Sequence, residues 1–322
     1  MRNHFEIPEI KPANWELKIE LDGELQRSFT YKELSGMHQH AVTAILECAG
    51  NGRKNFGTSV EGEIEWGDCA VGNGSWNGVR LSDLIDDVGL TPRDLGKVRE
   101  FLFTGKDGSQ DSSLPMEDAA RFVRALPKEK AMDENTLVAL QMNGRPLSKE
   151  RGFPARLLVP GWYAMASVKW LDRVAMSTKK TPFRGHFNGV KYVYETQKEG
   201  KWVTAPVTQL LVKSLITYPE EEDTVPSGRP IIVSGKAWSG FGKVVEVELD
   251  FGEGWMKTRL EDDRGSFGWR SWKYEWTPEK RGEIYLRARA TDETGNVQPE
   301  TVDSNRYLYG YNGIQKIRVD VT

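Results

Sequence analysis

The feature that most constrains the fold is a series of short strand-like segments in the last third of the chain. No helical pattern interrupts this series, and apolar positions recur within each segment. Short strands at regular spacing are typical of an all-β sandwich of immunoglobulin type. We therefore predict an immunoglobulin-like β-sandwich over residues 206–322. Turns that contain glycine or aspartate separate its segments, which span residues 231–234, 244–249, 255–260, 272–276 and 284–290.

The residues before this series mix strand and helix patterns and predict a separate α+β domain, residues 1–205. Alternation over 15–21, followed by Asp22-Gly23, predicts a β-hairpin. Leucines and isoleucine at helical spacing predict a helix that starts near Ser82 as its N-cap, and residues 116–126 predict another. Further predicted elements are strands at 41–46, 101–103, 137–142, 156–161 and 166–176, and a polar loop at 105–113.

Composition excludes several classes of protein. The chain has 322 residues and a net charge of −3, so it lacks the basic surplus of most nucleic-acid binders. No apolar run reaches the roughly 18–20 residues of a membrane span. No apolar stretch follows the first residues, so we expect no secretory signal and a cytoplasmic location. An export signal upstream of Met1 would instead place the protein in the periplasm.

Cys48 is the residue whose position stands out. The apolar run 41–46 ends in the sequence CAGNGR, so Cys48 lies where a buried strand leaves the core for a loop. Chemistry is often carried by loops on rigid strands, although a lone cysteine is more often a structural core residue. Nothing in the sequence marks Cys69 as a ligand. Two cysteines without a C-x-x-C motif indicate neither a disulfide framework nor a zinc ribbon.

Several motifs together resemble the sulfite oxidase family of molybdenum-cofactor enzymes. The turn ECAGNGR at 47–53 is similar to the family's C-A-G-N-x-R motif. The resemblance extends in order along the whole chain and includes the C-terminal dimerisation domain. The other matching segments are RNH at 2–4, WNGVRL at 76–81, MNGRPL at 142–147, GFPAR at 152–156, VPGWY at 159–163, SVKWL at 167–171, GKAWSG at 235–240 and NVQP at 296–299.

The resemblance implies a molybdenum–molybdopterin cofactor and names the residues that would hold it. Cys48 would bind molybdenum as a thiolate, because a soft ligand suits a redox-active metal. The phosphate and pterin of the cofactor need N–H donors and cations. The residues that would bind the pterin are Asn3, His4, Asp107, Arg151, Arg156, Ser167, Val168 and Lys169; family members often have histidine where this chain has Arg151.

The resemblance also implies a cationic substrate pocket for a small oxyanion. Arg2 and Arg53 match two of the family's arginines, and Lys243 stands where a third basic residue is expected. Lysine supplies charge but lacks the bidentate fork of arginine. Gln110 begins the stretch that corresponds to a tyrosine-containing family segment. Gln110 thus replaces the family's tyrosine, and this replacement leaves the physiological substrate open.

The implied function is oxygen-atom transfer to sulfite or a related small anion, with electrons passed to a separate acceptor protein. A reductase of nitrate or an S-oxide on the same cofactor is one alternative. A non-catalytic binding module with the same fold is another. We expect no haem in this chain, because its length leaves no room for a haem domain, and we expect a homodimer formed through the sandwich. The sequence does not reveal the electron acceptor or the form of the cofactor.

Overall fold

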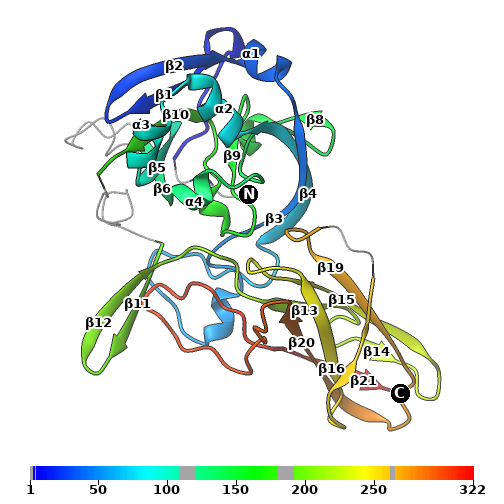
Figure 1. Cartoon of the computed structure of the whole chain (residues 1–322). Helices are drawn as coiled ribbons and strands as arrows, with labels where there is room; N and C mark the ends of the chain where they lie inside the picture. Colours follow the sequence, from blue (N-terminus) through cyan, green and yellow to red (C-terminus); the bar gives the residue numbers. More distant parts are fainter. Residues whose placement is uncertain (1–2, 4, 109–120, 180–191, 262–264) are drawn as a thin grey trace. The chain divides into compact units, whose positions relative to one another are not determined.

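The computed structural model describes residues 3, 5–108, 121–179, 192–261 and 265–322 (Figure 1). Contacts divide the chain into two compact units. Unit 1 comprises Met1–Val42 and Gly74–Thr208, and unit 2 comprises Thr43–Asn73 and Gln209–Thr322. The segment 43–73, which includes Cys48, therefore groups with the C-terminal residues and not with the rest of residues 1–205.

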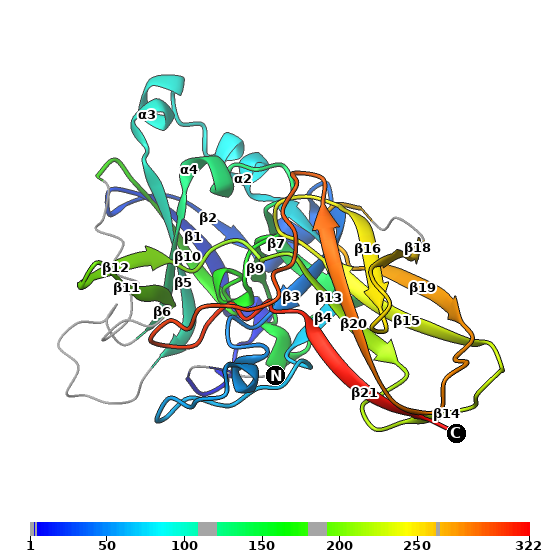
Figure 2. The same cartoon turned by 90° about the horizontal axis from the view of Figure 1, so that it is seen from below.

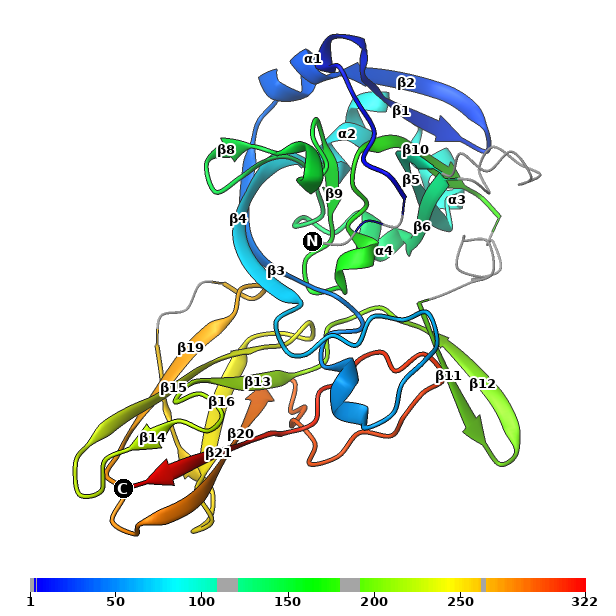
Figure 3. The same ribbon diagram turned by 180° about the vertical axis from the view of Figure 1, so that it is seen from behind.

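A five-stranded sheet forms the main part of unit 1, with the strand order β2-β1-β10-β5-β6. The predicted hairpin is confirmed, because β1 and β2 are antiparallel and joined at Asp22-Gly23 (blue in Figures 1 and 3). β10 runs parallel to β1, and all other neighbours in this sheet are antiparallel. The strands are β1 (Glu16–Leu21), β2 (Glu24–Thr30), β5 (Glu100–Gly108), β6 (Arg121–Pro127) and β10 (Leu171–Ser177).

Two sequence predictions in this sheet are wrong. Within the predicted helix 116–126, residues from Arg121 onward form β6, which pairs with β5 through Phe101–Leu126 and Phe103–Arg124. Pairing with a neighbouring strand overrides the local helical spacing. The predicted polar loop at 105–113 is also wrong in its first part, because β5 continues to Gly108. The rest of both predictions lies outside the described residues.

Helices in the described part of the chain are short. The predicted helix after residue 80 is confirmed as α2, but its N-cap is Arg80, without a side-chain hydrogen bond, and not Ser82. The backbone N–H of Leu81 instead donates to the carbonyl of Thr136. None of the described helices is long and apolar enough to cross a membrane. The helices are α1 (Tyr31–Gly36), α2 (Leu81–Val88), α3 (Pro92–Lys97) and α4 (Lys128–Ala131), with 3-10 turns at Pro12–Asn14, Arg53–Phe56, Lys149–Arg151 and Ala164–Ala166.

A second sheet has the order β3-β4-β7-β8, with β9 also paired to β7. The chain passes from unit 1 to unit 2 within β3 and returns within β4. β11 and β12 form a separate two-stranded hairpin, and every residue of β12 is exposed (Figure 1). These strands are β3 (His40–Glu47), β4 (Val71–Arg80), β7 (Leu137–Met142), β8 (Arg145–Pro146), β9 (Arg156–Leu158), β11 (Val193–Lys198) and β12 (Lys201–Pro206).

Unit 2 is built on two sheets that share one apolar core. The four-stranded sheet has the order β13-β15-β19-β18, and the five-stranded sheet has the order β14-β21-β20-β16-β17 (Figure 2). Trp272 and Val233 from the first sheet and Leu249 and Leu286 from the second belong to one buried cluster. The strands are β13 (Lys213–Tyr218), β14 (Thr224–Val225), β15 (Ile231–Trp238), β16 (Val244–Asp250), β17 (Met256–Lys257), β18 (Arg259–Leu260), β19 (Arg270–Trp276), β20 (Gly282–Asp292) and β21 (Gln315–Val321).

Candidate functional site

The turn that follows β3 holds Cys48 by backbone hydrogen bonds on both sides. The N–H of Cys48 donates to the carbonyl of Ala70 (2.9 Å), and its own carbonyl accepts from the N–H of Asn51 (2.9 Å). Cys48 is partly buried, Cys69 is exposed, and neither is joined in a disulfide. The strand end thus presents a thiol in a fixed backbone position.

Two buried polar side chains fix the same turn. Glu47 accepts a hydrogen bond from Asn51 Nδ2 (2.9 Å) and another from the indole N–H of Trp238 (2.8 Å). The amide oxygen of Asn51 in turn accepts from the backbone N–H of Ala70 (2.9 Å). Burial raises the pKa of Glu47, against the opposing effect of Lys213. The residue before the thiol is therefore anchored to a strand of the C-terminal part of the chain.

Lys213 is a functional candidate that the sequence analysis missed. Its side chain is only 1% exposed, although it carries an ammonium group. Its Nζ donates to Asp68 Oδ1 (3.3 Å) and to the carbonyl of Tyr311 (3.1 Å), and it lies 4.0 Å from Glu47 Oε1. The available signal was a lysine inside the otherwise apolar run LLVKSLI, because a charge in such a run is buried only with partners.

Arg53 lies at the end of the same turn and is almost completely buried. Its Nη1 donates to the carbonyl of Ile64 (2.8 Å) and forms an ion pair with Glu63 Oε2 (3.1 Å). The guanidinium also lies over the ring of Tyr309, 5.2 Å from the ring centre. Its buried Nε has no hydrogen-bond partner among the described residues. The expected cation is thus present at the turn, but a carboxylate of the same chain already neutralises it.

Gly50 explains how the guanidinium can fit against the turn. A Cβ atom at Gly50 would lie 2.8 Å from Nη2 and 2.9 Å from Cζ of Arg53. Real Cβ contacts are essentially never this short, so any larger residue would displace the guanidinium. Glycine at this position therefore lets the guanidinium of Arg53 lie against the turn.

The other residues expected at the substrate pocket are not all within the described structure. Lys243 lies just before β16, where its backbone N–H donates to Glu293 Oε1 (2.9 Å) and its carbonyl accepts from the N–H of Glu293 (2.8 Å). Arg2, His4 and Gln110 lie outside the described residues.

In unit 1 the structure brings most of the predicted pterin-binding residues together around Arg156. This arginine is buried on β9 and donates to the carbonyls of Ser167 (2.7 Å) and Arg151 (3.2 Å). Burial, with a contribution from the charge of Arg151, lowers the pKa of Arg156 to about 9. The hydroxyl oxygen of Ser167 accepts from the N–H of Val159 (2.9 Å).

Lys169 and Asp107 complete this cluster. Lys169 Nζ contacts Asn3 Oδ1 and donates to the carbonyl of Glu150 (3.2 Å). Burial, together with the charge of Arg156, lowers the pKa of Lys169 to about 8. Burial raises the pKa of Asp107 to about 6, and its Oδ1 accepts no hydrogen bond from the described residues.

Val168 differs from its neighbours. Its side chain is fully buried in the apolar core of unit 1, and its carbonyl accepts from the N–H of Leu157 (2.8 Å). Its N–H donates to the carbonyl of Ala166 (3.1 Å). The residue therefore supports the position of Ser167 and Lys169 and offers no side-chain group to a ligand.

The donor set of this cluster fits an anionic pterin cofactor. Three cations, Arg151, Arg156 and Lys169, lie close enough for the charge of one to lower the pKa of another. A phosphate would relieve this repulsion and accept their N–H groups. The buried Oδ1 of Asp107 is suited to accept an N–H group of a heterocycle. Among the described residues, no three His, Cys, Asp or Glu side chains are grouped to hold a metal ion.

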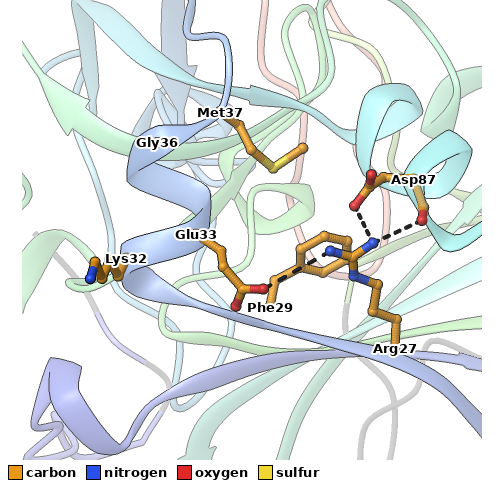
Figure 4. A pocket seen from close by; sticks show the side chains of 7 residues that line it. All are labelled: Arg27, Phe29, Lys32, Glu33, Gly36, Met37 and Asp87. Carbon is orange, nitrogen blue, oxygen red and sulfur yellow. Dashed lines mark hydrogen bonds and ion pairs between the residues drawn. The ribbon is translucent and has the colours of Figure 1, made fainter.

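A surface depression in unit 1 lies apart from the predicted residues (Figure 4). Its central cation, Arg27, donates to the backbone carbonyl of Asp87 (3.0 Å) and forms an ion pair with the side-chain carboxylate of Asp87. Nη2 of Arg27 also lies 4.0 Å from Glu33 Oε1. Because two carboxylates already offset this charge, the depression offers little to an anion. It is lined by Arg27, Phe29, Lys32, Glu33, Gly36, Met37 and Asp87.

Comparisons with known proteins match two consecutive parts of the chain to two family profiles. The profile of the oxidoreductase molybdopterin binding domain matches residues 4–185, and that of the Mo-co oxidoreductase dimerisation domain matches residues 204–322. Sulfite oxidase of Gallus gallus is 33% identical over 317 residues, which cover 94% of this chain and 67% of that protein. The chain therefore belongs to the molybdenum-cofactor oxidoreductases, and within them to the sulfite oxidase family.

Other similar proteins are longer than this chain. Mitochondrial sulfite oxidase of Rattus norvegicus is 30% identical, with 94% of this chain and 56% of that protein covered. NADH nitrate reductase of Cucurbita maxima is 30% identical, with 93% of this chain and 35% of that protein covered. The chain thus spans little more than half the length of the rat relative. The sulfane dehydrogenase SoxCD of Paracoccus pantotrophus has a similar structure, with a TM-score of 0.77, 27% identity, and coverage of 98% of this chain and 77% of that one.

Proposed function

We propose that the chain catalyses oxygen-atom transfer to sulfite or a related small anion. In the balanced reaction, sulfite gains an oxygen atom that comes from water and becomes sulfate, and two protons and two electrons are released. The electrons pass to a separate acceptor. The similarity to sulfite oxidases over 94% of the chain supports this reaction. The molybdenum cofactor, when bound, would supply the two-electron oxygen-transfer chemistry.

The observation that carries the proposal is the turn that holds Cys48. A thiol fixed between Ala70 and Asn51 is suited to bind a metal as its thiolate. The buried anchor from Glu47 to Trp238 keeps the backbone of the turn in place. A rigid turn favours ligand binding because little conformational freedom is lost when the ligand binds.

The chain's other residues would bind and orient the cofactor and the substrate. The cations around Arg156 would bind the phosphate of the pterin, and Asp107 would accept one of its N–H groups. Arg53 would bind the oxyanion next to the Cys48 turn. The proposed pterin-binding residues are Asn3, His4, Asp107, Arg151, Arg156, Ser167 and Lys169, and the proposed substrate cations are Arg2, Arg53 and Lys243.

A nitrate reductase is the second candidate function. The similarity to the Cucurbita maxima nitrate reductase over 93% of the chain favours it, although that protein is almost three times as long. Nitrate would become nitrite, its oxygen atom would leave as water, and two protons and two electrons would be consumed. The two candidates therefore differ in the direction of electron flow.

We also infer that unit 2 is an immunoglobulin-like sandwich through which two copies of the chain associate. Its two sheets over one core support the sandwich, and the match of residues 204–322 to a dimerisation domain supports the association. Sedimentation equilibrium of the purified chain should give twice the monomer mass.

The decisive experiment measures molybdenum content and sulfite-dependent reduction of ferricyanide on the same samples. The samples are wild type, Cys48→Ser and, as a matched control, Cys69→Ser. We expect near-stoichiometric molybdenum and sulfite turnover in wild type and Cys69→Ser, with both lost in Cys48→Ser. Molybdenum with turnover of nitrate but not of sulfite would favour the reductase. Wild-type protein without molybdenum, from a host that makes the cofactor, would overturn both sulfite oxidation and nitrate reduction and would favour a binding module.

A further inference from the structure

The loop that follows the Cys48 turn brings a carboxylate back onto Arg53. Glu63 Oε2 lies 3.1 Å from Arg53 Nη1, and the two side chains are only 4% and 2% exposed. The next residue, Ile64, offers its carbonyl to the same Nη1 (2.8 Å). That nitrogen thus has both a hydrogen-bond acceptor and a paired carboxylate within the chain itself.

The loop carries two other glutamates that differ from Glu63 in one respect. Glu61 and Glu65 are exposed to solvent, whereas Glu63 is turned inward onto the arginine. Burying a carboxylate is unfavourable unless it is paired. The inward position of Glu63 therefore follows from its ion pair with Arg53. Of these three glutamates, Glu63 is the one that offsets the positive charge of Arg53 at the Cys48 turn.

The remaining edge of the guanidinium faces the turn. Nη2 lies 2.8 Å from the position that a Cβ atom of Gly50 would take, and Nε has no hydrogen-bond partner among the described residues. An oxyanion that bound this edge would lie on the side opposite Nη1. It would interact with the positive charge of Arg53 and, slightly farther away, with the negative charge of Glu63.

From this geometry, and resting on the oxyanion role of Arg53 in the proposed function, we propose that Glu63 is a specificity-determining residue. It neutralises the charge of Arg53, so that the site by the Cys48 turn prefers monoanions to dianions. The reason is that the repulsion by Glu63 is proportional to the charge of the ligand. Hydrogen bonds from the Nε and Nη2 edge, in contrast, are available to either kind of anion.

Glu63→Gln separates this effect from a structural one. Glutamine keeps an acceptor oxygen in place of the carboxylate oxygen that lies 3.1 Å from Nη1, so the guanidinium keeps its position while the charge is removed. The matched controls are Glu61→Gln and Glu65→Gln, which remove the same charge from the exposed side of the same loop. Glu63→Ala serves as a second variant in case the glutamine variant fails to fold.

The test is calorimetric titration of the full-length chain, purified with its cofactor, with sulfate as the dianion and nitrate as the monoanion. Even with the full screening of water across roughly 6 Å, removing the charge should tighten nitrate binding at least about threefold and sulfate binding at least about tenfold. The factor by which the sulfate affinity rises should equal the square of the factor for nitrate, because sulfate carries twice the charge. The exposed-site controls should change either affinity less than twofold.

The opposite results overturn the inference. Unchanged or weaker sulfate binding in Glu63→Gln and Glu63→Ala would leave Glu63 with a purely structural role. Equal gains for the two anions would contradict a charge effect. Turnover is measured separately, so tighter sulfate binding in a protein that does not oxidise sulfite supports the role of Glu63 and rejects the proposed substrate. Sulfite oxidation with unchanged anion affinities in Glu63→Gln supports the proposed substrate and rejects the role of Glu63.

Discussion

Lys213 Nζ lies 4.0 Å from Oε1 of Glu47, the residue that precedes Cys48, and both side chains are almost completely buried. The ammonium group also contacts Asp68, which belongs to the segment that hydrogen-bonds back to the turn. One buried cation thus joins the end of β3 to the segment that contains Asp68. A buried ion pair adds little net stability, but removing one partner leaves the other uncompensated.

We predict that Lys213→Met destabilises the protein by roughly 3 kcal/mol, because the buried carboxylates lose their cation. Replacing Glu47 as well, in Glu47→Gln/Lys213→Met, should restore part of this loss, since a neutral amide no longer needs the ammonium. Urea unfolding followed by tryptophan fluorescence measures both effects. Lys236→Met, which removes a half-buried lysine bonded to Ser271, is the control. A double variant as unstable as Lys213→Met, or less stable, would contradict the coupling.

The contact of Gly50 with Arg53 predicts a loss of function without a loss of fold. In Gly50→Ala the new methyl group would lie within 3 Å of the guanidinium and push it out of place. We expect the KM for sulfite to rise at least about tenfold, as for a displaced bidentate donor. Gly72→Ala, where nothing lies within 4 Å of the new atom, should behave as wild type. Equal KM values in the two variants would show that Arg53 does not bind the substrate.

Local patterns in the sequence predicted much of the sheet structure, but not the parts that depend on distant partners. The hairpin at Asp22-Gly23 is encoded by a turn and by alternation, both local features. β6 was predicted as a helix because its pairing with β5 is not visible in its own residues. The same limit applies to α2, where the carbonyl of Thr136 replaces the expected cap at Ser82.

The site shows a similar division. The motif around Cys48 predicted a thiol at a strand end, because an apolar run followed by glycines encodes that turn locally. The partners Glu63 and Lys213 were missed, since each reaches the turn through the tertiary fold and neither belongs to a spaced motif. Buried charges in apolar or irregular segments are therefore the residues for which structure adds most to sequence.

The cation cluster of unit 1 predicts which variants lose the cofactor. Lys169→Met and Arg156→Met remove donors that face Asn3 and Ser167, so both should retain less than about a tenth of the molybdopterin found in wild type, a loss expected for charge-assisted bonds to a phosphate. Lys149→Met is the control, because Lys149 is exposed in the neighbouring turn. Cofactor content is measured by fluorescence of the oxidised pterin after its release. Full retention in both cluster variants would place the phosphate elsewhere.

Asp107 predicts a particular dependence of stability on pH in the cofactor-free chain. Its pKa is raised by burial from 3.8 to about 6, so the folded state holds a proton that the unfolded state has already released. The contribution of Asp107 to stability is therefore complete below about pH 4, declines as the pH rises to about 6, and stays reduced above it. The total loss is about 3 kcal/mol.

Asp107→Asn keeps the shape and cannot ionise, so it should match wild type near pH 4 and be more stable at pH 7. Asp94→Asn is a control, because hydrogen bonds from Lys97 and Thr91 lower the pKa of Asp94 below 3.8. Its contribution to stability changes only below about pH 4, so wild type and this variant should differ by a nearly constant amount from pH 4 to pH 7. Urea unfolding of the three proteins from pH 4 to pH 7 measures these differences. A stability difference between wild type and Asp107→Asn that does not change with pH would mean that Asp107 is already ionised in the folded protein at pH 4.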